Sequence, residues 1–215
     1  MAQIFPRWTN ELPLRVAVGG AVVGALVVGG IWYYFSPRYT DVGYQPVQPI
    51  AYSHKLHAGD LGIDCLYCHA TVDRAPVAVV PPTDVCLNCH KVVKRDAPTL
   101  AALRDSASSG RPLTWVRVHD LPAYARFDHR PHLRAGVGCA SCHGRIDQMV
   151  EVAQAEPLSM GWCLDCHRNP DPHLRPTSEI TTMDWSPPRD QAEAAARIRE
   201  AKRLKPPVDC TGCHQ

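Results

Sequence analysis

The sequence predicts a fold of short α-helices and coil, and three observations support this prediction. Proline, which interrupts helices and strands, accounts for 20 of the 215 residues, whereas phenylalanine accounts for only 3. A chain that is rich in proline and poor in aromatic residues makes a thin protein core. All 10 cysteines belong to five copies of one pattern, Cys-x-x-Cys-His, which begin at Cys65, Cys86, Cys139, Cys163 and Cys210.

Cys-x-x-Cys-His is the attachment signature of c-type haem. Both thiols add to the haem vinyl groups as thioethers, and the histidine that follows is an axial ligand of the iron. We therefore predict five covalently attached c-type haems, whose macrocycles form the apolar interior and whose attachment is coupled to folding. The predicted attachment residues are Cys65, Cys68, Cys86, Cys89, Cys139, Cys142, Cys163, Cys166, Cys210 and Cys213, and the motif ligands are His69, His90, His143, His167 and His214.

The predicted fold class is a multihaem cytochrome c with little regular secondary structure, in which short α-helices and coil surround five haems, plus one N-terminal transmembrane helix. Zinc is the main alternative, because 17 residues separate Cys68 from Cys86, a gap that fits paired Cys-x-x-Cys zinc sites. Five pairs do not group evenly into four-cysteine sites, however. A histidine also follows every pair, although only 11 residues are histidine. Disulfide bonds would not require those histidines, so the pattern favours haem.

Residues 16–35 form an apolar stretch without a charged side chain, VAVGGAVVGALVVGGIWYYF. This length spans a bilayer as a helix, and the aromatic residues 32–34 are typical of the membrane interface. A cleaved signal peptide would have a shorter apolar region that ends in small residues, so we predict a retained anchor in contact with lipid. The spacing of Gly20 and Gly24 favours packing against helices of another subunit.

The charges that flank this stretch predict its orientation. Arg7 and Arg15 precede it and only Arg38 follows closely, so the positive-inside rule places the N-terminus in the cytoplasm. We predict a single-pass protein of the cytoplasmic (inner) membrane with its haem domain on the periplasmic side. Its segments are a cytoplasmic N-terminus (1–15), a transmembrane helix (16–35), a linker (36–51) and a pentahaem cytochrome c domain (52–215).

An internal repeat divides the exported part of the chain. HKLHAGDLGIDCLYCH (54–69) matches HRPHLRAGVGCASCH (129–143) with one residue deleted. Each copy consists of His-x-x-His, a glycine-containing turn and a haem motif, and a further motif follows each copy. We therefore predict two dihaem modules and a terminal haem, over about 52–95, 115–176 and 210–214.

Two helices are predicted outside the haem motifs. One covers 98–105 and ends at the polar turn 106–110. The other covers 190–205, because it follows a pair of prolines, consists of good helix formers and stops at a second pair of prolines.

Five six-coordinate irons require ten axial ligands, of which the motif histidines supply five. Six further histidines remain, so histidine alone can fill every position with one to spare. Four of them lie in the duplicated His-x-x-His pairs. Met160, three residues before Cys163, is an alternative ligand that would raise the potential of its haem. The predicted distal ligands are His54, His57, His119, His129, His132 and His173, with Met160 as the alternative.

This ligand count distinguishes an electron carrier from an enzyme. A multihaem reductase requires an open iron for its substrate, and no iron is obliged to be open here. We find no pattern for a nucleophile or an acid–base pair, so no catalytic residue is predicted. The formal charge of +2 gives no argument for a nucleic-acid partner, and none is predicted.

Three stretches resemble the pentahaem, membrane-anchored cytochrome c subunit of bacterial alternative complex III. They are SHKLHAGDLGIDCLYCH (53–69), WVRVHDLPAYARFDHRPHLRAGVGCASCHGRID (115–147) and LSMGWCLDCHRNPDPHLRP (158–176). The resemblance implies a complex that oxidises menaquinol or ubiquinol and passes the electrons outward. It also implies three kinds of partner, namely polytopic quinol-binding subunits, an iron–sulfur subunit, and a monohaem cytochrome c or an oxidase as acceptor.

The His-x-x-His modules also resemble those of small class III cytochromes. That resemblance implies that His54 binds the haem held by Cys65, and that His129 binds the haem held by Cys139. The second members, His57 and His132, would then reach other haems.

We therefore expect an electron-transfer subunit of a quinol-oxidising membrane complex. A stand-alone, anchored quinol dehydrogenase is the alternative, and a multihaem reductase is a more distant one. Because residues 16–35 contain no ionisable side chain other than terminal tyrosines, which are poor bases at neutral pH, partner subunits must supply the proton acceptor for quinol.

Overall fold

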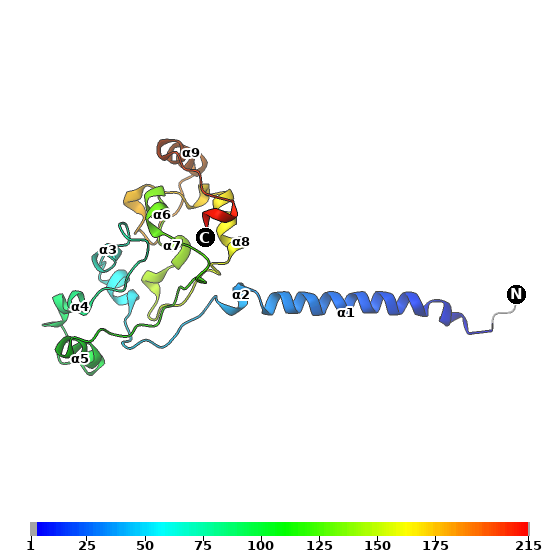
Figure 1. Ribbon diagram of the computed structural model, residues 1–215, viewed down its shortest axis with the longest axis horizontal. Helices are drawn as coiled ribbons and strands as arrows, with labels where there is room; N and C mark the ends of the chain where they lie inside the picture. Colours follow the sequence, from blue (N-terminus) through cyan, green and yellow to red (C-terminus); the bar gives the residue numbers. More distant parts are fainter. Residues whose placement is uncertain (1–3, 215) are drawn as a thin grey trace. The chain divides into compact units, whose positions relative to one another are not determined.

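The computed structural model describes residues 4–214, and internal contacts divide the chain into two units that meet between Asp41 and Val42. Most of the second unit is coil that joins short helices (Figure 1). Among the described residues the one strand-like feature is an isolated bridge between Val137 and Leu174. The α-helices are α1 (Leu12–Tyr34), α2 (Pro37–Thr40), α3 (Cys65–Cys68), α4 (Thr83–His90), α5 (Ala101–Ser109), α6 (His129–Ala135), α7 (Ala140–His143), α8 (Met160–Arg168) and α9 (Gln191–Lys202).

Single turns of other helix types complete the secondary structure. A π-helical turn covers Lys55–Asp60. The 3-10 turns are Arg7–Asn10, Pro98–Leu100, Ile146–Gln148, Asp171–His173, Thr177–Glu179 and Cys210–Gly212.

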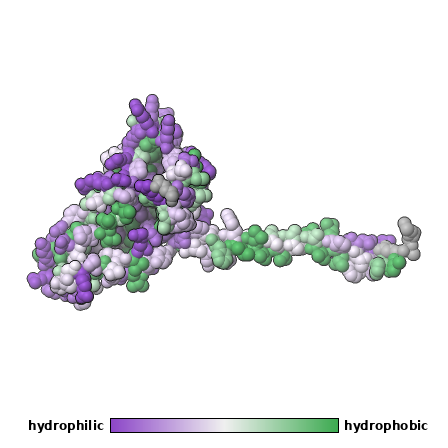
Figure 2. All heavy atoms as spheres, in the orientation of Figure 1, coloured by the Kyte–Doolittle hydropathy of each residue, from purple (hydrophilic) through white to green (hydrophobic). Residues whose placement is uncertain are grey.

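The first unit is built around α1, a helix of 23 residues that is long and apolar enough to cross a membrane. At a rise of about 1.5 Å per residue it extends for about 35 Å, compared with about 30 Å for a hydrocarbon core. Apolar side chains are exposed along its length (Figure 2). The helix begins four residues earlier than the expected span, because Pro13 fits the first turn of a helix, where its missing N–H is not needed.

Three tyrosines cluster at the C-terminal end of α1. The ring of Tyr39 in α2 lies 5.6 Å from that of Tyr33 and 4.8 Å from that of Tyr34, measured between ring centroids. The ring of Tyr39 in the short helix α2 therefore packs against the last turn of α1. Such a cluster of aromatic rings is typical of a membrane interface.

The second unit has a thin protein core, as the composition predicts. Its buried apolar residues are few and are spread over separate segments of the chain: Val72, Leu103, Leu133, Leu174, Met183 and Ala195. So small a set buries far less apolar surface than a domain of this length normally does. The fold therefore requires another source of apolar interior.

The linker expected over 36–51 is partly incorporated into the second unit. Gly43 N–H donates to the Gln154 carbonyl at 2.8 Å, and Gln154 N–H donates to the Tyr44 carbonyl at 3.0 Å. Further along, the Gln48 amide donates to and accepts from the backbone of Val116. These bonds fix the path of the chain from Gly43 onward.

Two helices end at positions that differ from the sequence expectations. The helix expected over 98–105 continues as α5 to Ser109, because Ser106 is buried and bonded to Thr83 and to the Arg111 carbonyl instead of forming a turn. It ends at Gly110, which has the left-handed φ of 68° that terminates helices. In the same way α9 stops at Arg203, which has a φ of 51°, before the second pair of prolines.

The segment between α6 and the third haem motif is packed tightly against Arg175. Gly136 ends α6 with a φ of 100°, and its carbonyl accepts the Arg175 N–H at 2.9 Å. A Cβ at this glycine would collide with the Arg175 carbonyl, and a Cβ at Gly138 would collide with the Arg175 guanidinium. Arg175 is itself buried and lies over the ring of Trp185, 4.2 Å from its centroid.

This packing yields a prediction about stability. Gly136→Ala adds a Cβ at a left-handed backbone position and against a carbonyl oxygen, so it should destabilise the haem-loaded protein by about 1–3 kcal/mol. Gly161→Ala is the matched control, since nothing lies near its Cβ position in α8 and alanine favours helix. Denaturant unfolding of both variants measures the difference. Equal stability of the two variants would contradict this account of the turn.

Candidate haem-binding site

Each Cys-x-x-Cys-His motif forms about one turn of helix, which places its two cysteines three residues apart on one helix face. Polar side chains begin three of these turns. Asp64 accepts a hydrogen bond from Leu66 N–H at 2.7 Å, Ser159 from Trp162 N–H at 3.3 Å and Asp209 from Gly212 N–H at 3.2 Å. All ten thiols are free. The local sequence therefore presents each pair of sulfurs toward one side.

The histidine rings are oriented by hydrogen bonds to backbone carbonyls. Because a carbonyl can only accept, the Nδ1 atom in each of these bonds carries the proton, and Nε2 is the nitrogen that can bind iron. The same arrangement orients histidines in metal sites generally. The acceptors are the carbonyls of Val79 for His69, Val93 for His90, Pro207 for His167, Tyr124 for His214, Ser53 for His57, Pro76 for His129 and Asp128 for His132, at 2.6–3.1 Å.

The two His-x-x-His copies have the same local geometry. In the first copy the ring of Tyr52 lies 4.8 Å from that of His54, nearly at a right angle, and 4.4 Å from that of His57, nearly parallel. In the second copy Phe127 replaces the tyrosine, at 4.7 Å from each histidine ring. An aromatic ring therefore separates and orients both histidines of each pair.

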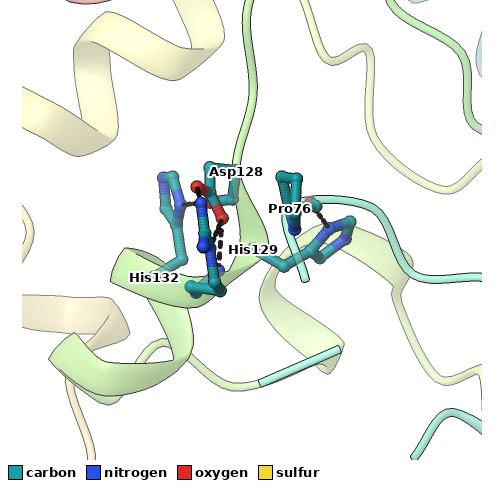
Figure 3. A network of polar contacts seen from close by, with 5 residues as sticks. Pro76, Asp128, His129 and His132 are labelled. Carbon is teal, nitrogen blue, oxygen red and sulfur yellow. Dashed lines mark hydrogen bonds and ion pairs between the residues drawn. The ribbon is translucent and has the colours of Figure 1, made fainter. Parts of the chain in front are cut away.

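The second copy also contains an ion pair. Asp128 begins α6, accepts from Arg130 N–H at 2.9 Å and pairs with the Arg130 guanidinium at 2.6 Å (Figure 3). The bond from Arg130 is the main reason that the pKa of the Asp128 carboxyl falls to about 2. The carbonyl of the same aspartate accepts from His132, as Figure 3 shows, so one residue both starts the helix and orients a candidate ligand.

Three candidate distal histidines face motif histidines. Metal–imidazole bonds of about 2 Å on both sides, with about 1.1 Å from each nitrogen to its ring centre, put two trans ligands roughly 6–6.5 Å apart between centroids. The observed centroid distances are 6.2 Å for His57–His90, 6.0 Å for His132–His167 and 6.5 Å for His129–His143. Each of these pairs therefore has the spacing that a shared iron requires.

The remaining histidines near the third motif are partly buried. Burial is the main cause that lowers the pKa of His143 to about 3 and that of His54 to about 4. Burial also lowers the pKa of His119, whose ring lies 4.3 Å from that of His143. A neutral imidazole is the form that binds iron. His54 Nδ1 and His119 Nε2 are buried without a hydrogen-bond partner, as suits groups whose function needs a further ligand.

Two candidates have fewer contacts that favour ligation. His173 is half-buried in the 3-10 turn Asp171–His173, and burial lowers its pKa. Met160 begins α8 with 66% of its surface exposed. At the fifth motif the ring that faces His214 belongs to Tyr124, with centroids 6.0 Å apart. All the axial ligands stay predictions, and for the fifth motif the contacts favour no particular partner.

Sequence reasoning missed the residues that orient these ligands. Tyr52 and Phe127 occupy the same place two residues before each His-x-x-His pair, so comparison of the two copies would have found them. The roles of the Pro76 and Pro207 carbonyls could not be predicted from the sequence. Pro76 accepts from His129, 53 residues away, and Pro207 accepts from His167, 40 residues away.

Comparison with known proteins agrees with this geometry. Residues 125–215, which hold three of the five motifs, match the family model for cytochrome c7 and related cytochrome c. A curated relative, the multihaem cytochrome c subunit of menaquinone reductase from Nitratidesulfovibrio vulgaris, is 33% identical over 140 residues. The alignment covers 62% of this chain and 64% of that relative, so it spans less than two thirds of the relative's length.

The donor set therefore fits c-type haem. Free cysteine pairs lie beside histidines whose Nδ1 is already bonded, and the scarcity of buried apolar residues suits an interior filled by macrocycles. These observations and the family match confirm the predicted fold class, a cytochrome c7-like multihaem domain of helix and coil with one N-terminal apolar helix. Residues 125–215 are therefore similar to cytochrome c7 and related cytochrome c, in which Cys-x-x-Cys-His motifs attach haem covalently.

The number of haems is directly measurable. We predict five covalent additions of haem, one per motif, on the mass of the purified chain. The matched control is the double variant Cys210→Ser with Cys213→Ser, which should carry four haems. A wild-type mass with four additions or fewer would contradict the count.

The facing histidine pairs predict which haem each distal ligand serves. His132→Ala should leave the haem of His167 with one axial ligand, so one of five haems should become high-spin. The matched control is His129→Ala, which should affect the haem of His143. Electron paramagnetic resonance of the ferric protein reports high-spin iron.

Combination with cysteine variants identifies the affected haem. The high-spin signal of His132→Ala should vanish when Cys163 and Cys166 are replaced by serine, because that haem is then absent. The signal should persist when Cys139 and Cys142 are replaced. The opposite pattern would refute the pairing.

Proposed function

We propose that this chain is the electron-transfer subunit, with five c-type haems, of a membrane complex that exchanges electrons with quinol. One observation carries the proposal: candidate distal histidines face motif histidines at the spacing of a shared iron, as in the His57–His90 pair at 6.2 Å. Histidine on both sides leaves no position for a substrate on the metal. The site is thus suited to relaying electrons and not to a reaction on a substrate.

When bound, each haem supplies one-electron redox chemistry, because its iron alternates between the ferric and ferrous states. The chain's own residues attach, orient and enclose it. The cysteines would fix its edge, and backbone carbonyls hold seven of the imidazoles with Nε2 available. Tyr52 and Phe127 each contact both histidines of a pair.

The helix α1 is proposed as a membrane anchor with a cytoplasmic N-terminus and a periplasmic haem unit. Oxidation of a quinol to a quinone releases two electrons and two protons, and the protons require an acceptor. The charged side chain within α1 is Arg15, a guanidinium that does not act as a base. The quinol site must therefore lie on partner subunits, for which we propose polytopic membrane proteins together with an iron–sulfur subunit.

The direction of electron flow has two candidates. The resemblance to alternative complex III favours quinol oxidation, with a monohaem cytochrome c or an oxidase as acceptor. The relative from Nitratidesulfovibrio vulgaris is named a menaquinone reductase subunit, which favours the reverse direction. The direction depends on the haem potentials, which axial ligands, burial and charge tune. The same fold can therefore serve either direction of electron flow. Initial rates of quinol oxidation and quinone reduction by the complex purified from native membranes decide between them.

A test with the isolated subunit separates a relay from a stand-alone quinol dehydrogenase. The haem-loaded chain in detergent should show no rapid, saturable reduction by menaquinol, because α1 contains no carboxylate or imidazole that could accept the protons. The complex purified from native membranes should show it, and polytopic subunits should be present. Dithionite, which reduces haems directly, is the control for redox competence. Saturable reduction of the isolated chain by menaquinol would favour the stand-alone enzyme instead.

A further inference from the structure

We infer that the five haem motifs form one unbranched row in the spatial order motif 2, motif 1, motif 3, motif 4, motif 5. Here motif 1 is 65–69, motif 2 is 86–90, motif 3 is 139–143, motif 4 is 163–167 and motif 5 is 210–214. The order differs from the order along the chain at its beginning, where motif 1 becomes internal and motif 2 becomes an end. The inference deepens the proposed function, and only its consequence for electron entry and exit rests on that function.

Motifs 1 and 2 lie side by side. The Asn88 side-chain amide in motif 2 donates to the Tyr67 hydroxyl in motif 1 at 3.1 Å. The pair His57–His90 joins the segment before motif 1 to motif 2.

Motif 1 is also adjacent to motif 3. Two hydrogen bonds link the two motifs through residues 180–181, because Thr181 Oγ1 donates to Asp64 Oδ2, next to Cys65, at 2.9 Å while the neighbouring Ile180 carbonyl accepts from Cys139 N–H at 2.9 Å. Motif 1 therefore has two neighbours and cannot be an end.

Motif 3 continues to motif 4. Helix α6, which leads into motif 3, places His132 6.0 Å from His167 of motif 4. Only residues 136–138 separate α6 from motif 3, so motif 3 and motif 4 are neighbours.

Motif 4 continues to motif 5. The His167 Nδ1–H of motif 4 donates to the Pro207 carbonyl at 2.6 Å, and the ring of Pro207 packs directly against Gly212 of motif 5. These contacts complete the row.

Exposure agrees with this order. Two of the ten cysteines are exposed, Cys89 in motif 2 and Cys210 in motif 5, and the other eight are partly buried. These two motifs are the ends of the inferred row. The two ends are therefore the places where one redox partner would deliver electrons and another would remove them.

The magnetic coupling between haems tests the order on the haem-loaded chain alone. Removal of an end haem should change the electron paramagnetic resonance signal of one remaining ferric haem, whereas removal of an internal haem should change two. The end variants are Cys86→Ser with Cys89→Ser and Cys210→Ser with Cys213→Ser. The matched internal variants are Cys65→Ser with Cys68→Ser and Cys163→Ser with Cys166→Ser. Two changed signals in an end variant, or one in an internal variant, would overturn the order.

Loss of a haem can prevent folding, so a second pair of variants keeps every haem attached. His90→Met and His69→Met change the axial ligand, and hence the magnetic properties, of one haem each. His90→Met should alter the power saturation of one other haem, because motif 2 is an end of the row. His69→Met should alter that of two other haems, because motif 1 is internal. Two altered haems in His90→Met, or one in His69→Met, would overturn the order. These measurements use neither quinol nor a partner. The order can therefore fail while co-purification of polytopic subunits still supports the proposed function, and the converse also holds.

Discussion

Covalent attachment at Cys-x-x-Cys-His is the constraint on which the rest of this structure depends. The second unit contains only a few scattered buried apolar residues, such as Leu103, Leu133 and Leu174. Side chains alone therefore bury too little apolar surface to offset the conformational entropy that folding removes. We propose that macrocycles tied to the backbone at the Cys-x-x-Cys-His motifs supply the missing interior. Short helices are then sufficient, because each needs only to present two sulfurs and one imidazole.

The local sequence predicted the chemistry of the site well, because the chemistry is encoded within five consecutive residues. The cysteine pairs, the motif histidines and the thin core all follow from the sequence. The repeat also led to the histidines that face motif histidines, such as His57 and His132. What failed was local termination: the helix expected to end at Asp105 continues to Ser109, because burial of Ser106 outweighs its preference for turns.

Long-range geometry could not be predicted, because it depends on contacts between residues far apart in the chain. The Pro76 carbonyl orients His129, and Thr181 bonds to Asp64 across 117 residues. The spatial order of the motifs arises from such contacts. A duplicated sequence suggests two modules placed one after the other, whereas the third motif packs against the first, so the two modules share one interior.

The central claim is that protein side chains fill both axial positions of the irons in the haem-loaded chain. X-ray absorption at the iron edge tests it most directly, because it reports the mean number and length of the iron–ligand bonds. The account predicts six short iron–nitrogen bonds per iron, with at most one sulfur among the ten axial ligands if Met160 replaces a histidine. A mean coordination number near five would contradict the claim, since it would reveal open irons of the kind that a reductase uses.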